Sequence, residues 1–358
     1  MKKILFLFFS FFITALSFAQ FSISGQVTDG ETKLPLEGAS VFAQNTTIGT
    51  ITNKEGGYKI SLSKGGYELI ISYTGYSTKI ITVEATDNKQ LDIELKKEDK
   101  SMSEVVIQSS NEVADGWQQY GDFFTNHFIG ATPFADSCFL LNPEVLKFYF
   151  YKRSNKLKVL ATAPLQITNK SLGYHLSYAL DSFVYYYKTE INSYRGTCLY
   201  TPMDGSMEEQ NLWTENRSKT YHGSRLHFLR SYYDSTLKEE GFNVDLLSKR
   251  DNKKFNRLVN PYDTTYYGVV ESTNDVELWF PAKASITYNK QKPETAYLQQ
   301  FGLPLDVGVQ ISYVDLLDPI VIKQNGFFID ARSWINQGYW SWKNIADQLP
   351  YNYIPGEK

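Results

Sequence analysis

The sequence contains few of the side chains from which most active sites are built. Among its 358 residues there are only two cysteines and four histidines. It has no Gly-x-Ser-x-Gly nucleophile elbow, no Gly-Lys-Ser/Thr phosphate loop and no Cys-x-x-Cys pair. Activated nucleophiles, general bases and metal ligands come largely from such residues and motifs. The sequence therefore favours a protein without catalytic activity, and we expect no metal and no other cofactor.

Long apolar runs are also missing after the first twenty residues. Two lysines precede an apolar stretch at residues 4–16, and Ser17-Phe18-Ala19 places small residues where a signal peptidase cleaves. We predict a signal peptide at residues 1–19, cleaved after Ala19, and export to the periplasm or the outer-membrane periphery. The alternative is a membrane anchor, which needs about twenty apolar residues.

Positive charge is not in excess. The chain has 36 Lys and Arg against 39 Asp and Glu, and loss of Lys2 and Lys3 with the signal peptide would leave a net charge of about −5. Nucleic-acid-binding surfaces are basic, so nucleic acid is not expected as a partner. No later stretch reaches the length of a membrane helix, so no transmembrane segment is expected after cleavage.

Aromatic residues, in contrast, are abundant, with 26 Tyr and 23 Phe. Large rings pack well across strands, so the composition favours a mainly β fold. Between residues 20 and 98, short alternating stretches separated by glycine-rich turns predict a seven-stranded β-sandwich. The predicted strands lie at residues 23–28, 39–43, 50–52, 58–62, 67–73, 79–83 and 91–95.

The alternation within these strands divides their side chains between core and solvent. The side chains expected to face solvent are Lys59, Ser61, Glu68, Asp92 and Glu94. Those expected in the core are Val27, Val41, Tyr58, Ile60, Leu62, Leu69, Ile71, Ile81, Leu91 and Ile93.

Four ordered segments of this region carry a family resemblance. They are GQVTD at residues 25–29, LPLEGASV at 34–41, GTITNKEGGY at 49–58 and SYTGY at 72–76. The region resembles the transthyretin-like carboxypeptidase regulatory-like domain, which is found in exported proteins of the Bacteroidetes type. In that family the domain is an accessory module, so the resemblance implies a β-sandwich with an interaction role and no reaction of its own.

Two known companions of this domain are not recognisable in the remaining sequence. A zinc carboxypeptidase would need His-x-x-Glu, but none of the four histidines has Glu three places later. Residues 102–107 resemble the segment that joins this domain to the plug of TonB-dependent receptors, but roughly 250 residues cannot supply a barrel of about 22 strands. We assign the charged stretch at 96–101 to a domain boundary and residues 99–107 to a linker.

Residues 108–358 are predicted to form a strand-rich α+β domain. Helical spacing is found at 116–129, at 224–240 after the capping residue Ser224, and in a short stripe of Trp342, Ile345, Ala346 and Leu349. The layout resembles an uncharacterised region that follows this sandwich in other exported proteins, which implies no activity. Strands are predicted at 146–151, 157–163, 165–168, 174–188, 276–280, 284–288, 296–300, 309–314 and 320–322.

Two sets of polar residues are candidates for chemistry in this region. His222 and His227 are five residues apart, whereas a metal pair on one helix needs a spacing of four, so polar positions without metal are favoured. Acidic residues could supply the two carboxyl groups of a glycoside hydrolase, with solvated surface as the favoured alternative. These acidic residues are Glu239, Glu240, Glu271, Asp275 and Glu277.

Two further sets could bind a ligand or form a crosslink. Trp334, Tyr339, Trp340 and Trp342 form an aromatic cluster that would contact a glycan or a protein if exposed; core packing is the alternative. Export would place Cys138 and Cys198 where a disulfide can form, with two buried thiols as the alternative.

Together these features favour a non-catalytic binding or structural protein of the cell envelope. The sandwich would be its accessory interaction module, and an envelope protein or a polysaccharide would be its partner. The alternative is an exported hydrolase that acts on glycan or peptide through an unrecognised carboxylate site in residues 108–358.

Overall fold

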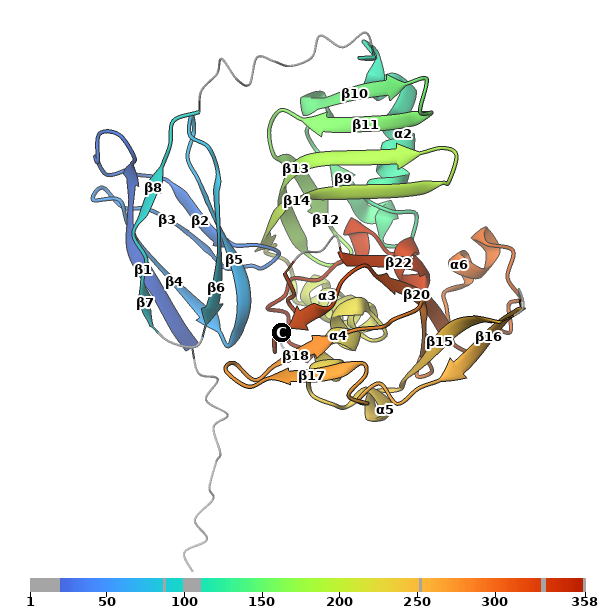
Figure 1. Cartoon of the computed structure of the whole chain (residues 1–358). Coiled ribbons are helices and arrows are strands. Elements are labelled where there is room, and N and C mark those ends of the chain that lie inside the picture. Colours follow the sequence, from blue (N-terminus) through green and yellow to red (C-terminus); the bar gives the residue numbers. More distant parts are fainter. Residues whose placement is uncertain (1–19, 86–87, 99–110, 251–252, 330–332, 357–358) are drawn as a thin grey trace, which may run out of the picture.

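The computed structural model describes residues 20–85, 88–98, 111–250, 253–329 and 333–356 (Figure 1). The predicted signal peptide (1–19) and linker (99–107) lie outside these residues. The described chain is mainly β, with an N-terminal sandwich followed by a strand-rich α+β region, which confirms the predicted fold class. Among the described residues, no helix has the length and apolarity needed to cross a bilayer.

The sandwich consists of two four-stranded sheets. The strand predicted at 91–95 is shortened to β8 (Ile93–Leu95), and an unpredicted strand, β7 (Lys89–Gln90), precedes it; both pair in parallel with β1 (Gln20–Asp29). One sheet contains β4 (Gly57–Ser63), β1 (Gln20–Asp29), β7 (Lys89–Gln90) and β8 (Ile93–Leu95). The other contains β3 (Gly49–Ile51), β2 (Ser40–Ala43), β5 (Gly65–Ser72) and β6 (Lys79–Ala85).

The predicted core of the sandwich is largely confirmed. Eight of the ten expected core residues are buried, while Ile81 and Leu91 are partly buried against the same cluster. Glu68 is an exception among the residues expected to face solvent, because it is half-buried and burial raises the pKa of its carboxyl. The outward residues Phe42 and Ile70 are also buried without belonging to the sandwich core. A second body therefore covers this face of the sandwich.

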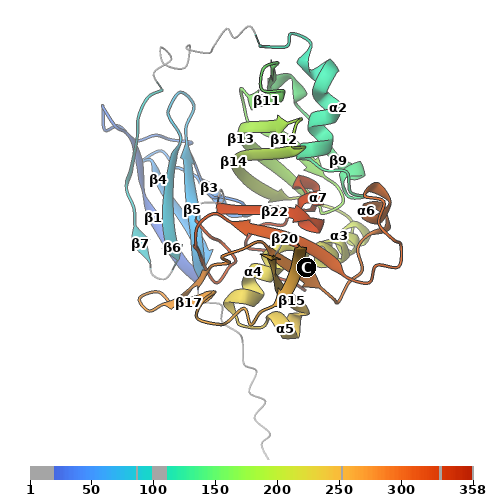
Figure 2. The ribbon, with the colours of Figure 1, turned by 45° about the vertical axis from the view of Figure 1, so that its right-hand side comes forward.

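The following part of the chain forms a six-stranded antiparallel sheet. Helix α2 (Gly116–Phe128) packs on one face through Phe124 and Phe128, as its aromatic spacing predicts (Figure 2). The 3-10 helices η1 (Ala135–Ser137) and η2 (Pro143–Val145) flank β9. The strands are β9 (Cys138–Leu140), β10 (Leu146–Tyr151), β11 (Lys156–Ala161), β12 (Leu165–Asn169), β13 (Tyr174–Tyr186) and β14 (Ile191–Pro202).

A second large core lies in the remainder, so the predicted single region contains two large hydrophobic clusters and a smaller third one. It lies between helix α4 (Arg225–Tyr233), a five-stranded sheet and a three-stranded sheet. The five-stranded sheet has the order β16 (Lys253–Leu258), β15 (Phe242–Arg250), β19 (Ala284–Tyr288), β20 (Gln310–Leu316) and β22 (Trp334–Gly338). The smaller sheet has the order β17 (Tyr267–Val270), β18 (Asp275–Leu278) and β21 (Ile320–Ile322).

The predicted secondary structure needs correction at one helix, at one strand and at one helix that no pattern predicts. Residues 224–240 form two helices, α4 and α5 (Leu237–Glu240), because Ser235 has a φ of 58° and ends the first one. The predicted strand at 296–300 is wrong: α6 (Thr295–Gln300) is a helix that buries the adjacent residues Tyr297 and Leu298 together. Helix α3 (Met207–Tyr221) was not predicted, because its sequence is polar almost throughout.

The C-terminal segment contacts all three cores in turn. Trp334 and Trp340 lie in the core beside α4, and α7 (Tyr339–Trp342) turns the chain away. The 3-10 helix η4 (Ile345–Asp347) places Ile345 and Ala346 in the core of the six-stranded sheet. The backbone N–H of Tyr351 then donates 2.7 Å to the carbonyl of Asn45 in the sandwich. This segment therefore joins the three bodies.

Candidate functional site

A hollow on the sandwich is lined mainly by its β4-β1-β7 sheet, with Thr50 and Ile51 added from β3 of the other sheet. It is an open depression of about 730 Å³. Phe42 and Ile70, the residues buried against the rest of the chain, are not among those that line it. Its lining residues are Ser24, Gly25, Gln26, Thr50, Ile51, Asn53, Gly57, Tyr58, Lys59, Gln90 and Asp92.

Close backbone contacts form the floor of this depression. A Cβ atom added to Gly25 would lie 2.0 Å from the carbonyl oxygen of Leu91, so only glycine fits there. The hydroxyl of Tyr58 donates 2.8 Å to the same carbonyl. The side chain of Asn53 accepts bonds from the backbone N–H groups of Glu55, at 3.1 Å, and Gly57, at 2.7 Å. The rim therefore presents amide, hydroxyl and charged groups on a fixed backbone.

The recognised motif segments meet in a second polar contact of the sandwich. The hydroxyl of Tyr76 donates 2.6 Å to Asp29, which also accepts bonds from the N–H groups of Glu31 at 2.8 Å and Thr32 at 2.9 Å. The Tyr76 bond is the largest cause of the pKa of Asp29 falling well below its ordinary value. Asp29 and Tyr76 therefore join the end of β1 to the turn after β5, which is a structural role.

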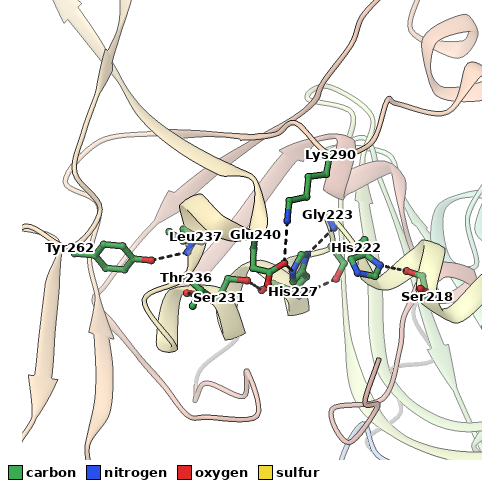
Figure 3. A network of polar contacts seen from close by, with 11 residues as sticks. Ser218, His222, Gly223, His227, Ser231, Thr236, Leu237, Glu240, Tyr262 and Lys290 are labelled. Carbon is green, nitrogen blue, oxygen red and sulfur yellow. Dashed lines mark hydrogen bonds and ion pairs between the residues drawn. The ribbon is translucent and has the colours of Figure 1, made fainter. Parts of the chain in front are cut away.

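The two histidines considered for metal binding lie at the junction of α3 and α4 (Figure 3). His222 donates from Nδ1 to the carbonyl of Ser218 at 2.8 Å. His227 is buried, and its Nε2 lies 3.2 Å from Glu240, whose carboxylate also lies 3.8 Å from Nζ of Lys290. The backbone N–H of Gly223 donates to Nδ1 of His227 at 3.1 Å.

These bonds determine what His227 can do chemically. Because Nδ1 accepts a hydrogen bond, the ring proton of the neutral form is on Nε2 and is donated to Glu240. Burial is the largest cause of the fall in the pKa of His227 to about 4. Both ring nitrogens are thus occupied by the protein itself, so this arrangement holds α4 to α5 and leaves no lone pair for a substrate.

The acidic residues predicted as a carboxylate pair are not brought together. Asp275 is buried and lies 2.5 Å from Nζ of Lys323, which also lies 2.5 Å from Glu84 of the sandwich. Glu240 belongs to the contact with His227. Glu239, Glu271 and Glu277 take part neither in that contact nor in the ion pairs of Lys323. Asp275 is thus paired with Lys323, whereas Glu240 accepts a hydrogen bond from neutral His227 and lies near Lys290.

The four predicted aromatic binding residues all lie in the interior. Trp334 and Trp340 are 5% and 7% exposed and pack with Phe228. Tyr339 and Trp342 are 2% and 5% exposed and form a small cluster with Tyr297 and Leu298. The ring nitrogen of Trp340 donates to the carbonyl of Gly223 at 2.6 Å. This burial supports the alternative interpretation, in which the four rings pack in the core. They offer no binding surface.

The candidate disulfide is contradicted, since Cys138 and Cys198 are buried free thiols. Cys138 is on β9 and Cys198 on β14, and β12 and β13 lie between these strands. The three interstrand steps alone amount to roughly 14 Å, and Cys198 is also offset by four residues along β13, whereas a disulfide joins Cα atoms within about 7 Å. Burial raises the pKa of the Cys138 thiol to about 12 and that of the Cys198 thiol further.

One buried charged cluster had no counterpart in the sequence analysis. Nζ of Lys343 lies 3.1 Å from Glu294 and 3.5 Å from Asp347, and Thr132 donates to Asp347 at 2.7 Å. Burial is the largest cause of the raised pKa of Asp347. Lys343 and Asp347 are four residues apart, but Thr132 and Glu294 come from distant parts of the sequence, so no local pattern predicts the cluster. Within the part of the chain that the structure describes, no group of three or more His, Cys, Asp or Glu residues could hold a metal ion.

Comparison with known proteins classifies the sandwich. Residues 23–107 match the family model of the CarboxypepD_reg-like domain. This part of the chain is a carboxypeptidase regulatory-like domain. The match extends beyond β8 into residues outside the described structure. No curated protein matches the chain.

Three solved structures illustrate the structural likenesses. A type II cohesin–X-dockerin complex from Acetivibrio cellulolyticus is 24% identical over 22% of this chain and 58% of that chain, with a TM-score of 0.20. The minor pilin of Streptococcus agalactiae is 23% identical over 23% and 46%, with a TM-score of 0.19. A DUF3823 family protein from Parabacteroides merdae is 9% identical over 75% and 90%, with a TM-score of 0.19. At such TM-scores, the function must be argued from the chain's own residues.

Proposed function

We propose that this protein is a non-catalytic binding protein of the cell envelope and that the depression on its regulatory-like domain binds a polysaccharide. The observation that carries the proposal is the polar lining of the depression on the sandwich. Sugar hydroxyl groups both donate and accept hydrogen bonds, and the rim offers amide and hydroxyl groups that do the same, the Lys59 ammonium group as a donor and the Asp92 carboxylate as an acceptor. Export, as predicted from residues 1–19, would bring this face to the polysaccharides of the envelope.

A polysaccharide suits this lining better than a protein partner does. Protein interfaces are anchored by large aromatic or arginine side chains at their centre. Here Tyr58 is buried, and Ile51, 70% exposed, is the large apolar side chain at the rim. Lys59 and Asp92 contribute one charge of each sign. A neutral, hydrogen-bonding polymer therefore fits the lining best.

The rest of the chain would hold this module in place. The sandwich is joined to residues 323–352 by the Lys323–Glu84 ion pair, by Asn325, which donates 2.9 Å to the carbonyl of Gly66, and by Asn352, which donates 2.7 Å to Thr47. These contacts hold the sandwich against a larger body. Such an arrangement is suited to binding or structural support.

The proposal is tested with the mature protein, residues 20–358. Binding to purified envelope polysaccharide and to peptidoglycan fragments is measured by isothermal titration and by pull-down. The variant Lys59→Ala/Gln90→Ala removes two exposed polar side chains of the rim, and we expect it to weaken binding at least tenfold.

A matched control keeps this test specific. The variant Lys152→Ala/Gln118→Ala removes one exposed lysine and one exposed glutamine outside the depression, and its affinity should equal that of the unchanged protein. Equal binding by the rim variant would place the site elsewhere. Recovery of a protein and no glycan after cross-linking in the envelope would replace the polysaccharide with a protein partner.

A further inference from the structure

The loop between α6 and β20 exposes a short apolar segment. All eight residues from Gln299 to Asp306 are exposed, and they include Phe301, Leu303 and Leu305 at 53%, 39% and 65%. Pro304 adds a further apolar surface, and Asp306 is the one charged residue of the eight. Together the three large side chains present roughly 300 Å² to solvent, a patch of a size that is often functional on a monomer.

Local bonds hold this loop in a compact form. The N–H of Leu303 donates 2.8 Å to the carbonyl of Leu298, and the N–H of Phe301 donates 3.1 Å to that of Tyr297. Tyr297 and Leu298 are buried against Tyr339 and Trp342, so the loop stands on a fixed base. The loop is held by its backbone bonds and by the buried residues at its base. The exposure of its apolar side chains is therefore a property of the fold.

The size and backbone of the segment decide which occupant fits. A stable protein interface buries about 800 Å² on each partner, which is well above what this segment offers. Its own turn bonds occupy backbone groups that a partner strand would need. Insertion into a lipid surface needs neither shape complementarity nor backbone pairing, because apolar and aromatic side chains enter the headgroup boundary individually.

We infer that Phe301, Leu303 and Leu305 insert into a lipid surface and attach the protein to a membrane. The inference rests on the proposed function for export, which would place the chain between membranes. Lys and Arg are absent from residues 299–306. The protein is therefore attracted to the membrane by burial of its apolar side chains and not by charge attraction to anionic lipids. Attachment should therefore occur on zwitterionic lipid and change little with salt.

Vesicle flotation tests this inference. The mature protein is mixed with phosphatidylcholine–phosphatidylethanolamine vesicles, with and without an anionic lipid, at low and high salt. The unchanged protein should float in every case, and Phe301→Ser/Leu303→Ser/Leu305→Ser should partition at least tenfold less. The matched control Leu34→Ser/Ile80→Ser/Ile191→Ser removes three side chains that are 64%, 52% and 50% exposed elsewhere, and its partition should be unchanged.

Each other outcome has a defined meaning. Failure of the unchanged protein to float, flotation only with anionic lipid at low salt, or equal flotation of the loop variant overturns the inference. A dimer that the loop variant converts into a monomer, seen by light scattering, assigns the segment to a second copy and also overturns it. If flotation fails while the protein still binds polysaccharide through the sandwich, the proposed function stands and only the lipid contact is lost.

Discussion

Nζ of Lys323 lies 2.5 Å from the carboxylate of Glu84, although 239 residues separate them in the sequence. The same ammonium group lies 2.5 Å from Asp275, so one lysine joins the sandwich to the three-stranded sheet. Burial acts to lower the pKa of Lys323, but the two carboxylates raise it above its ordinary value. The ion pair is thus charged at neutral pH and helps to hold two cores together.

The variant Lys323→Ala should destabilise the protein by about 3 kcal/mol, because it leaves the carboxylate of Asp275 buried without a partner. The loss is measured as the free energy of unfolding in urea, together with the rate of proteolysis between sandwich and remainder. Lys283→Ala breaks the Lys283–Asp315 pair, whose side chains are 32% and 35% exposed, and should cost less than about 1 kcal/mol. An equal loss of unfolding free energy in both variants would contradict the stabilising role of the buried Lys323–Asp275 pair.

His227 should make stability depend on pH between about 6.5 and 4. Its pKa is about 4 in the folded protein against an ordinary value of 6.5, so in this range the unfolded chain binds more protons. Stability is therefore complete above pH 6.5 and falls as the pH is lowered, by about 2 kcal/mol at pH 5.

The pH effect is measured by urea unfolding at pH 7 and pH 5. In His227→Phe the difference between the two pH values should shrink by that amount. His175→Gln changes an exposed histidine, and its pH profile should match that of the unchanged protein. A His227→Phe variant with the original profile would show that other groups cause the dependence.

Cys138 and Cys198 should behave as two unreactive thiols. Burial raises the pKa of both, so little thiolate forms near neutral pH. A thiol reagent should label neither residue in the folded protein and both in urea. The unfolding free energy should not change on addition of dithiothreitol, whereas a decrease would reveal a disulfide.

Trp340→Ala should destabilise the protein by about 3 to 5 kcal/mol, because it removes a buried ring and the bond to Gly223. Trp117→Ala is the control, since that ring is 38% exposed, and should cost clearly less. Polysaccharide affinity at a temperature where Trp340→Ala remains folded should be unchanged. A specific loss of affinity would instead support a binding role for this ring.

Local alternation was sufficient to locate the sandwich and most of its core. A strand exposes alternate residues to each face, so Tyr58, Ile60 and Leu62 could be separated from Lys59 and Ser61 without the fold. The same rule failed for Glu68, because the body that covers this face comes from later parts of the chain, such as Asn325, which bonds to Gly66, and Cys198, which bonds to Asn45. A local sequence pattern cannot predict a contact between residues so far apart in the chain.

Short helices were less predictable. Residues 296–300 are predicted as a strand, yet they form α6, which buries the adjacent Tyr297 and Leu298 because the C-terminal Tyr339 and Trp342 pack beside it. The break between α4 and α5 depends on the left-handed backbone of Ser235, a conformation that serine rarely adopts. Tertiary packing determined both the helical state of α6 and the break between α4 and α5.

The sequence by itself determined the sandwich, its family resemblance and the mainly β class, because these follow from local patterns of two to ten residues. Only the tertiary structure decided that the four C-terminal aromatics are core, that the two thiols lie far apart and that Lys323, Glu84 and Asp275 meet. The reason is physical: burial and charge pairing depend on which distant segments lie side by side, and that arrangement belongs to the whole chain.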